Sequence, residues 1–255
     1  MPIRTFPLVL IWLLLSTPCS GFEPVSGYAF MGEETRAMQD DEFENPGMFM
    51  VERGADLFNE KRLDEAHACS SCHGEHGEGL DKSRIAAYPV VDANLGGLVT
   101  LQGRISYCWE IRMDRFPHEY DHPELVALET FVRNLALGQT IAVAAGGPAA
   151  ELLQQAEAIY NTRYGQLDMS CHHCHDQHSG QMLRGQLLSQ GQANGFPEYR
   201  LGQGKVYSLH QRLRECFVSF RADPFEPGSM EFKLLELYLM RRANGLKIET
   251  PAVRY

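Results

Sequence analysis

Two short segments of the chain combine cysteine and histidine at the spacing used for covalent haem attachment. Both read Cys-x-x-Cys-His, at residues 69–73 and 171–175. Two thiols at this spacing can form thioethers to the haem vinyl groups, while the imidazole that follows reaches the iron. A zinc site or a redox disulfide also uses paired cysteines, but the export signal and the internal repeat described below favour haem. We therefore predict two c-type haems, attached and ligated through Cys69, Cys72 and His73, and through Cys171, Cys174 and His175.

The elements around the two motifs repeat along the chain. Phe58 and Tyr160 each lie fifteen residues before the histidine of their motif. Apolar residues at three- and four-residue spacing predict helices around the motifs, and the last helix of each half ends at Gly138 or Gly245. Three pairs of segments correspond, at offsets of 102, 108 and 107: 54–59 with 156–161, 104–108 with 212–216, and 124–131 with 231–238.

This repeat predicts a mostly α-helical fold of two tandem class I-like cytochrome c domains related by internal duplication. We place the first domain at 22–138 and the second, with the active site, at 150–255. A linker at 139–149 contains Gly-Gly-Pro, a composition typical of a domain boundary. The acidic stretch 31–45 fits either an extended arm or a solvated helix.

Each iron needs a sixth ligand, and we expect Cys108 and Cys216 to supply it because they occupy equivalent positions in the repeat. A disulfide between these two cysteines is the alternative in an oxidising compartment. A thiolate ligand holds the reduction potential low, which argues against a high-potential electron shuttle. Methionine is another possible sixth ligand, but the candidate methionines do not fall at equivalent positions of the repeat: Met113, Met182, Met230 and Met240. Histidine is a third possible ligand, from His118, His122, His178 or His210.

The first residues predict export. Arg4 precedes an apolar run at 6–15 and then small, turn-forming residues, as in a cleaved signal peptide, which we place at 1–21 and which includes Cys19. The run is shorter than the roughly 20 residues that span a bilayer. We therefore expect a periplasmic protein with no membrane span after cleavage. With 23 basic and 33 acidic residues, the net charge of −10 disfavours nucleic acid as a partner.

Motifs in the second half resemble the SoxA family of bacterial sulfur oxidation. They are Asn-Gly-Phe-Pro-x-Tyr-Arg at 194–200, Arg-Leu-Arg-Glu-Cys at 212–216, Arg-Ala-Asp-Pro at 221–224, Gly-Ser-Met-Glu-Phe at 228–232, Leu-Glu-Leu-Tyr-Leu at 235–239 and Ile-Glu-Thr-Pro-Ala-Val-Arg at 248–254. The resemblance implies an L-cysteine S-thiosulfotransferase, which joins thiosulfate oxidatively to a cysteine of the carrier SoxYZ and passes two electrons to haem. It also implies a small haem subunit, SoxX. By its motif, Cys216 would be both haem ligand and the sulfur-bearing residue, often as a persulfide.

Arg212 is the second residue that we expect to be catalytic. It lies four residues before Cys216, so the two side chains share a helix face. Its guanidinium can orient a dianionic substrate and favour the thiolate. The equivalent Arg104 has a structural role or supports the Cys108 thiolate. Further basic residues complete an anion funnel if the fold brings them together: Arg200, Lys205, Arg214 and Arg221.

Two rival functions stay open on the sequence alone. The first is a thiosulfate dehydrogenase, which forms tetrathionate from two thiosulfates and needs no carrier protein. The second is a low-potential electron-transfer cytochrome without chemistry of its own, in which Cys216 only sets the potential. An assay with and without carrier distinguishes the thiosulfate dehydrogenase from the thiosulfotransferase. The mass of the intact protein reveals any extra sulfur on Cys216 and so distinguishes the electron-transfer cytochrome from the enzyme.

Overall fold

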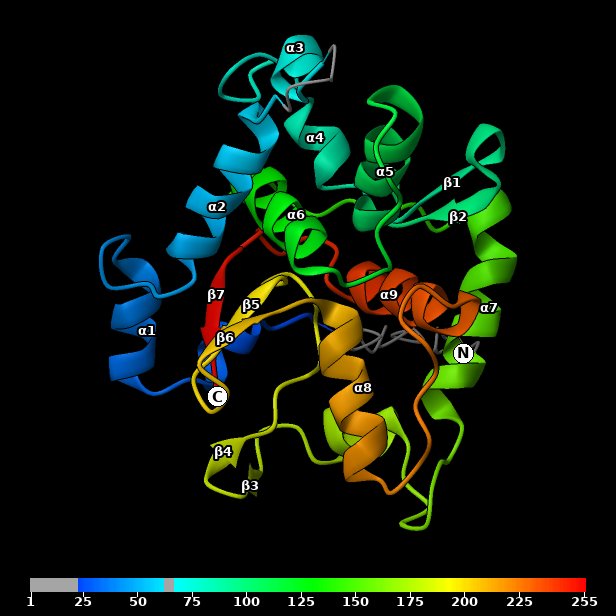
Figure 1. The fold of residues 1–255 in the computed structure, drawn as a ribbon. Coiled ribbons are helices and arrows are strands. Elements are labelled where there is room, and N and C mark those ends of the chain that lie inside the picture. Colours follow the sequence, from blue (N-terminus) through cyan, green and yellow to red (C-terminus); the bar gives the residue numbers. More distant parts are fainter. Residues whose placement is uncertain (1–22, 62–66) are drawn as a thin grey trace, which may run out of the picture.

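The computed structural model of this chain describes residues 23–61 and 67–255. Its elements form two mainly helical halves, each with a few short strands of its own (Figure 1), which confirms the predicted fold class. The predicted signal peptide lies outside the described residues. Within the described ranges, no helix has the length and apolar character needed to cross a bilayer.

The helices and strands follow one another along the chain in two unequal groups. The first half contains η1 (Gly27–Phe30), α1 (Glu33–Asp40), α2 (Met48–Asn59), α3 (Ser70–His73), α4 (Lys82–Ile85), β1 (Val90–Asp92), η2 (Ala93–Leu95), β2 (Gly97–Val99), α5 (Leu101–Tyr107), η3 (Cys108–Arg112) and α6 (Pro123–Leu135). The second contains α7 (Pro148–Asn161), η4 (His173–Gln177), β3 (Met182–Leu183), β4 (Gln186–Leu187), β5 (Glu198–Arg200), β6 (Lys205–Tyr207), α8 (Leu209–Ser219), α9 (Met230–Arg242) and β7 (Ala252–Arg254).

The internal repeat is visible in how the first and last helices of each half pack. Helix α2 packs on α6, and α7 packs on α9. At the first crossing, the rings of Phe58 and Phe131 lie 5.2 Å apart between centroids, and at the second those of Tyr160 and Tyr238 lie 4.9 Å apart. These aromatic pairs come from corresponding positions of the two halves, so the repeat in sequence is a repeat in packing.

A small residue allows each crossing to be close. A Cβ atom added to Gly54 would lie 2.2 Å from the carbonyl oxygen of Ala127 and 2.6 Å from Cβ of Phe131. The corresponding residue of the second half, Ala156, is fully buried. The residue types at these two positions therefore set how near the paired helices approach.

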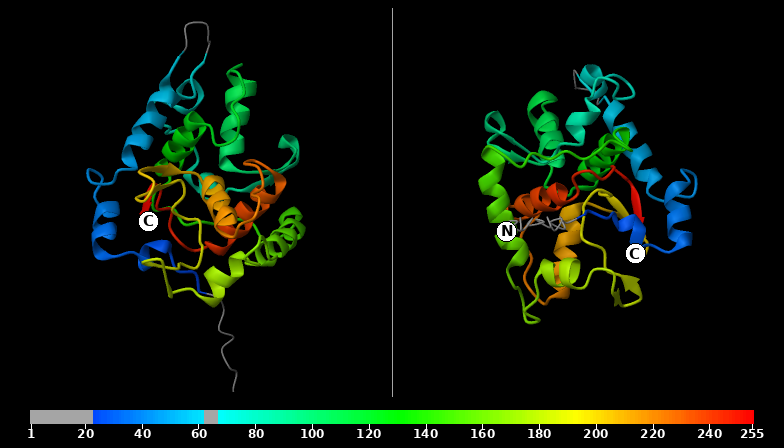
Figure 2. Two further views of the ribbon diagram at one scale, coloured as in Figure 1. Left: turned by 60° about the horizontal axis from the view of Figure 1, so that its bottom comes forward. Right: turned by 180° about the vertical axis from the view of Figure 1, so that it is seen from behind.

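The N-terminal segment packs against the other end of the chain. Helix α1 lies beside β7 in Figures 1 and 2. The side chain of Gln39 accepts a hydrogen bond from the backbone N–H of Val253 at 3.1 Å, and Asn45 donates to the carbonyl of Pro251 at 2.9 Å. Of the two alternatives for 31–45, a helix is correct over its central part. In the adjoining sheet β5 is central, antiparallel to β6 and parallel to β7.

The segment predicted as a linker is partly incorporated into the core. Ile141 and Val143 are buried, and the backbone of Ile141 pairs with Gly245 and Leu246. Asn244 binds both the N–H and the carbonyl of Val143 at 2.9 Å. The start of 139–149 is thus held by the loop after α9, while the predicted domain boundaries stay predictions.

Candidate haem and sulfur site

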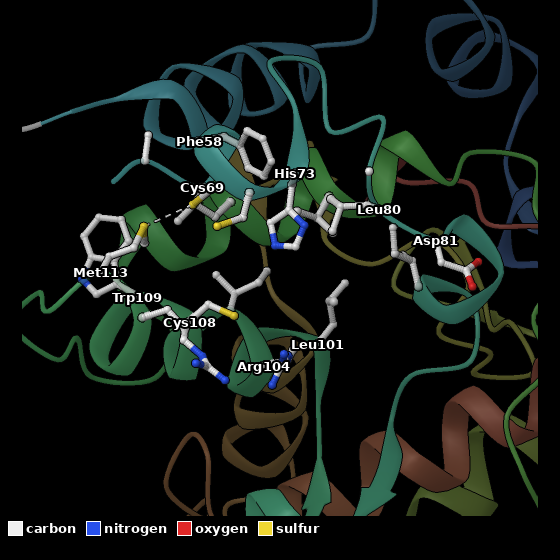
Figure 3. Close-up of a pocket in the computed structure, with 18 of the residues that line it drawn as sticks. Phe58, Cys69, His73, Leu80, Asp81, Leu101, Arg104, Cys108, Trp109 and Met113 are labelled. Atoms are coloured by element: carbon white, nitrogen blue, oxygen red, sulfur yellow. Dashed lines mark hydrogen bonds between the residues drawn. The ribbon is translucent and has the colours of Figure 1, made fainter. Parts of the chain in front are cut away.

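A cavity of about 640 Å³ lies beside the first Cys-x-x-Cys-His motif. Figure 3 shows the imidazole of His73 on one wall and the Cys108 sulfur on the facing wall, with Arg104 next to it. Helix α5 carries Arg104 and ends at Tyr107, and the π-helical turn η3 begins at Cys108. Such turns are frequent at functional sites because they change the direction in which side chains point. Apolar side chains form most of the remaining wall: Phe58, Leu80, Ile85, Leu101, Leu128 and Val132.

The donor groups and walls of this cavity suit a covalently attached haem. Cys69 and Cys72 both line it, which puts the two attachment thiols and the imidazole at one cavity. Burial, opposed by the positive charge of Arg115 and aided by the charge of the nearby Cys108, raises the pKa of the Cys69 thiol to about 11. Burial also lowers the pKa of His73, so the ring is neutral and has a lone pair for a metal.

The described cysteines are all free, so no disulfide joins Cys108 to Cys216 in this structure. Met113 also lines the cavity, but its sulfur lies 3.8 Å from the Cys69 sulfur, on the attachment side. His118 and His122 are not part of the lining. They stack on each other at 3.8 Å, and His118 hydrogen-bonds Glu124 at 3.0 Å.

In the second half, the loop after the motif fixes the orientation of His175. Its Nδ1 lies 2.8 Å from the carbonyl oxygen of Ser189, an acceptor, so Nδ1 carries the proton and Nε2 keeps its lone pair. Gly191 lies against the ring: a Cβ there would come within 2.9 Å of Cγ of His175, and the backbone φ is +77°. Burial lowers the pKa of this histidine, which keeps it neutral. Sequence reasoning missed both Ser189 and Gly191.

Cys216 and Arg212 adjoin the second motif. Burial raises the pKa of Cys171 to about 12, with Cys216 as the next cause, and the same two causes raise the pKa of Cys174. The negative charge of Cys216 is the main cause that raises the pKa of Arg212. Helix α8 positions this pair and begins with a capping box between Ser208 and its third residue, which satisfies its first N–H groups.

A second arginine lies beside Arg212. Arg200, on β5, is 8% exposed, and its pKa is lowered by burial and then by the positive charge of Arg212. Both arginines have acidic partners, because Arg200 lies 3.3 Å from Glu198 and Arg212 lies 3.1 Å from Glu215. The other members of the predicted funnel are exposed: Lys205, Arg214 and Arg221.

An ion pair behind the second motif was also missed from the sequence. Asp176, directly after His175, binds His172 at 2.8 Å and forms a salt bridge with Arg242. Although burial acts to raise it, the hydrogen bonds from His172 and Arg242 lower the pKa of Asp176. The guanidinium of Arg242 also lies over the ring of Tyr160, 5.1 Å from its centroid. An acidic residue immediately after the motif was the available signal.

The remaining candidate ligands of the second half occupy other environments. Met240 is buried in the core, while Met182 and Met230 are exposed. His178 is exposed and contacts Gln181 at 3.2 Å. His210 is buried, and its Nδ1 accepts a hydrogen bond from a backbone N–H in the loop before α9.

Comparisons with known proteins agree with this geometry. The model of the SoxA/TsdA cytochrome c domain matches residues 53–141 and 155–248. The chain is 39% identical over 229 residues to the L-cysteine S-thiosulfotransferase subunit SoxA of Rhodovulum sulfidophilum, which covers 90% of this chain and 79% of the relative. It is 36% identical over 230 residues to SoxA of Paracoccus pantotrophus, with the same two coverages.

A solved structure is similar over nearly the whole chain. The crystal structure of SoxXA from P. pantotrophus matches with a TM-score of 0.84 and 34% identity, covering 91% of this chain and 87% of that one. A cytochrome c domain carries covalently bound c-type haem, and the cavity beside Cys69, Cys72 and His73 is suited to hold it. The chain therefore belongs to the SoxA family of cytochromes c, whose curated members are subunits of L-cysteine S-thiosulfotransferase.

Proposed function

We propose that this chain is the catalytic, dihaem subunit of a periplasmic L-cysteine S-thiosulfotransferase. It couples thiosulfate to a cysteine thiol of a SoxYZ-type carrier and works with a small SoxX-type cytochrome subunit. The proposal rests on one observation above all: Cys216 adjoins both thiols of the second motif and shares helix α8 with Arg212, in a chain of the SoxA family.

The chain offers matching sets of ligands for two haems. We assign His73 and Cys108 to the first iron and His175 and Cys216 to the second. When bound, the haems supply one-electron acceptors in an oxidised state. The protein's own contribution is burial, which keeps both imidazoles neutral, and the Ser189 carbonyl, which holds the proton of His175 on Nδ1 and leaves Nε2 for the iron.

Sulfur transfer is proposed to run through Cys216 in two steps. In the first, the Cys216 thiolate and the terminal sulfur of thiosulfate form an S–S bond and release two electrons, giving a cysteine S-thiosulfonate. In the second, the carrier thiolate attacks the sulfur next to the sulfonate group, which transfers that unit to the carrier and regenerates the Cys216 thiolate. Over both steps the carrier thiol loses one proton to solvent.

Arg212 has two functions in this proposal. Its guanidinium lies near enough to Cys216 for the charge of that sulfur to raise the pKa of Arg212, so it puts a positive charge beside the reacting sulfur. It also offers paired N–H donors to the sulfonate oxygens, although one donor already contacts Glu215 at 3.1 Å. Arg200 adds a second guanidinium behind it.

The test compares Cys216→Ser with Cys108→Ser in the haem-loaded complex. These residues are equivalent in the repeat, so the second variant controls for the loss of a thiol at a haem site. We expect Cys216→Ser to abolish formation of the carrier adduct, measured by mass spectrometry of the carrier, and Cys108→Ser to retain it. Intact-protein mass spectrometry of the wild type would show any additional sulfur on Cys216.

Two results would favour the rival functions. Tetrathionate formed at full rate without carrier would identify a thiosulfate dehydrogenase. Normal adduct formation by Cys216→Ser would leave only an electron-transfer role for the second haem site.

A further inference from the structure

A buried cluster of ionisable groups lies where the two halves meet. Glu129 on α6 and Glu236 on α9 are 7% and 4% exposed, and the charge of Glu236 acts on Glu129. They are equivalent in the internal repeat, separated by the offset of 107 that relates their helices. Figure 1 shows α9 between α8 and the helices of the first half. The two carboxyl groups therefore belong to one buried cluster at the contact between the halves.

The partners of these carboxyl groups also come from equivalent positions. Gln102 on α5 donates its amide N–H to Glu129 at 2.9 Å. His210 on α8 has Nε2 3.2 Å from an oxygen of Glu236, without good hydrogen-bond alignment. Gln102 and His210 differ by the offset of 108, and both are 1% exposed.

The positive charge around the cluster does not balance its carboxylates. Nδ1 of His210 accepts a hydrogen bond from the N–H of Gly228 at 3.0 Å, so that nitrogen has no proton and the ring is neutral. The titratable and charged groups that face Glu129 and Glu236 come from α6, α8 and the loop before α6: Arg133, His210, Tyr120 and Asp121. Among these described groups, the three carboxyls are those of Glu129, Glu236 and Asp121, and the one guanidinium is that of Arg133.

Like charges buried in one cluster favour retention of a proton by one of them. We propose that Glu129 and Glu236 share one proton and act as a pH-sensitive latch between the two halves. With the proton in place, one carboxyl is neutral and the two halves close on each other. Its loss at alkaline pH leaves two adjacent buried carboxylates, whose repulsion loosens the contact.

The partners of the two latch carboxyls lie on helices that lead to a predicted haem ligand. Gln102 lies on α5, which is followed directly by Cys108, and His210 lies on α8, which carries Cys216. A looser contact therefore increases the mobility of both helices together. Burial, with the Glu236 charge as the next cause, raises the pKa of Glu129 to about 7, which supports a transition near neutral pH.

Infrared pH titration of the haem-loaded protein tests the shared proton directly. We expect a protonated-carboxyl C=O band that disappears as pH rises through neutrality, and that Glu129→Gln and Glu236→Gln each remove. Haem propionates absorb in the same region, so the wild-type minus variant difference is the quantity measured. Glu231→Gln, on the same helix as Glu236 but partly exposed, is the matched control and retains the band.

Hydrogen exchange provides the second measurement. In the wild type, amide exchange in α5 and α8, corrected for its intrinsic pH dependence, should rise at least several-fold between pH 6 and about 9. In Glu129→Gln this rise should be absent. Haem content and circular dichroism establish that each variant folds. If Glu129→Gln does not fold, Glu236→Gln is measured in its place. A wild-type infrared difference without a titrating carboxyl band, or an unchanged exchange rise in a folded variant, would overturn the proposal.

Discussion

Replacing Glu129 with glutamine should stabilise the protein at alkaline pH, although it removes a charged residue from the core. The pKa of this carboxyl is raised from 4.5 to about 7, because of burial and then because of the Glu236 charge. The folded state thus binds a proton between these pH values that the unfolded state releases. Stability from this group is complete below pH 4.5 and is lost as pH rises through about 7.

The size of the effect follows from the same two values. A rise from 4.5 to about 7 corresponds to about 3 kcal/mol at pH 8. Glutamine has nearly the same shape, keeps an acceptor for the Gln102 amide and adds a donor for Glu236. Glu129→Gln should therefore gain about 1–3 kcal/mol relative to wild type at pH 8 and much less at pH 5.

Guanidinium unfolding of the haem-loaded protein, followed by far-ultraviolet circular dichroism at pH 5 and pH 8, measures this difference. Glu231→Gln, which lies on α9 and is partly exposed, should leave stability at both pH values nearly unchanged. Our reasoning is wrong if Glu129→Gln unfolds more easily than wild type at pH 8. It is equally wrong if the variant loses as much stability as wild type between pH 5 and pH 8.

Three further substitutions test the site and the packing. Arg212→Gln should raise KM for thiosulfate about 10- to 100-fold in the carrier-adduct assay, because a charge-assisted contact is lost. Arg214→Gln, the control, should leave KM unchanged. Equal effects of the two substitutions would show that Arg212 has no special role. Gly191→Ala should displace the His175 ring and alter the low-spin electron paramagnetic resonance signal of the second haem, whereas Gly185→Ala, which has positive φ but open space, should not. Gly54→Ala should cost about 1–3 kcal/mol in chemical unfolding, since its Cβ meets the backbone of α6; unchanged stability would show that the helices separate at no cost.

The haem chemistry of this chain is readable from the sequence because it is encoded over a few residues. Attachment needs two thiols and an imidazole at a fixed spacing, and both motifs have them. The repeat added Cys108 and Cys216, since one structural position serves both halves. The structure puts the first of these across the cavity from His73 and the second beside its own motif.

Among the residues that could have ligated iron, sequence spacing had little power to choose. Met113 and His118 lie five and ten residues after Cys108, yet only Met113 lines the cavity, and it lies on the attachment side. The turn η3 and the loop after it determine these directions, and the sequence pattern does not report them. For the same reason, Arg200 could be listed with four other basic residues but not singled out as the neighbour of Arg212.

The sequence by itself thus determined the covalent chemistry, the helical duplication and the family, because each depends on residue types at short or regular spacing. Tertiary structure alone decided which groups meet across the molecule. Ser189 and Gly191 orient His175 from a loop, α1 packs on β7, and the charge of Glu236 acts on Glu129 from 107 residues away. Such contacts depend on how whole helices pack, and the burial that results sets the proton affinities on which the latch depends.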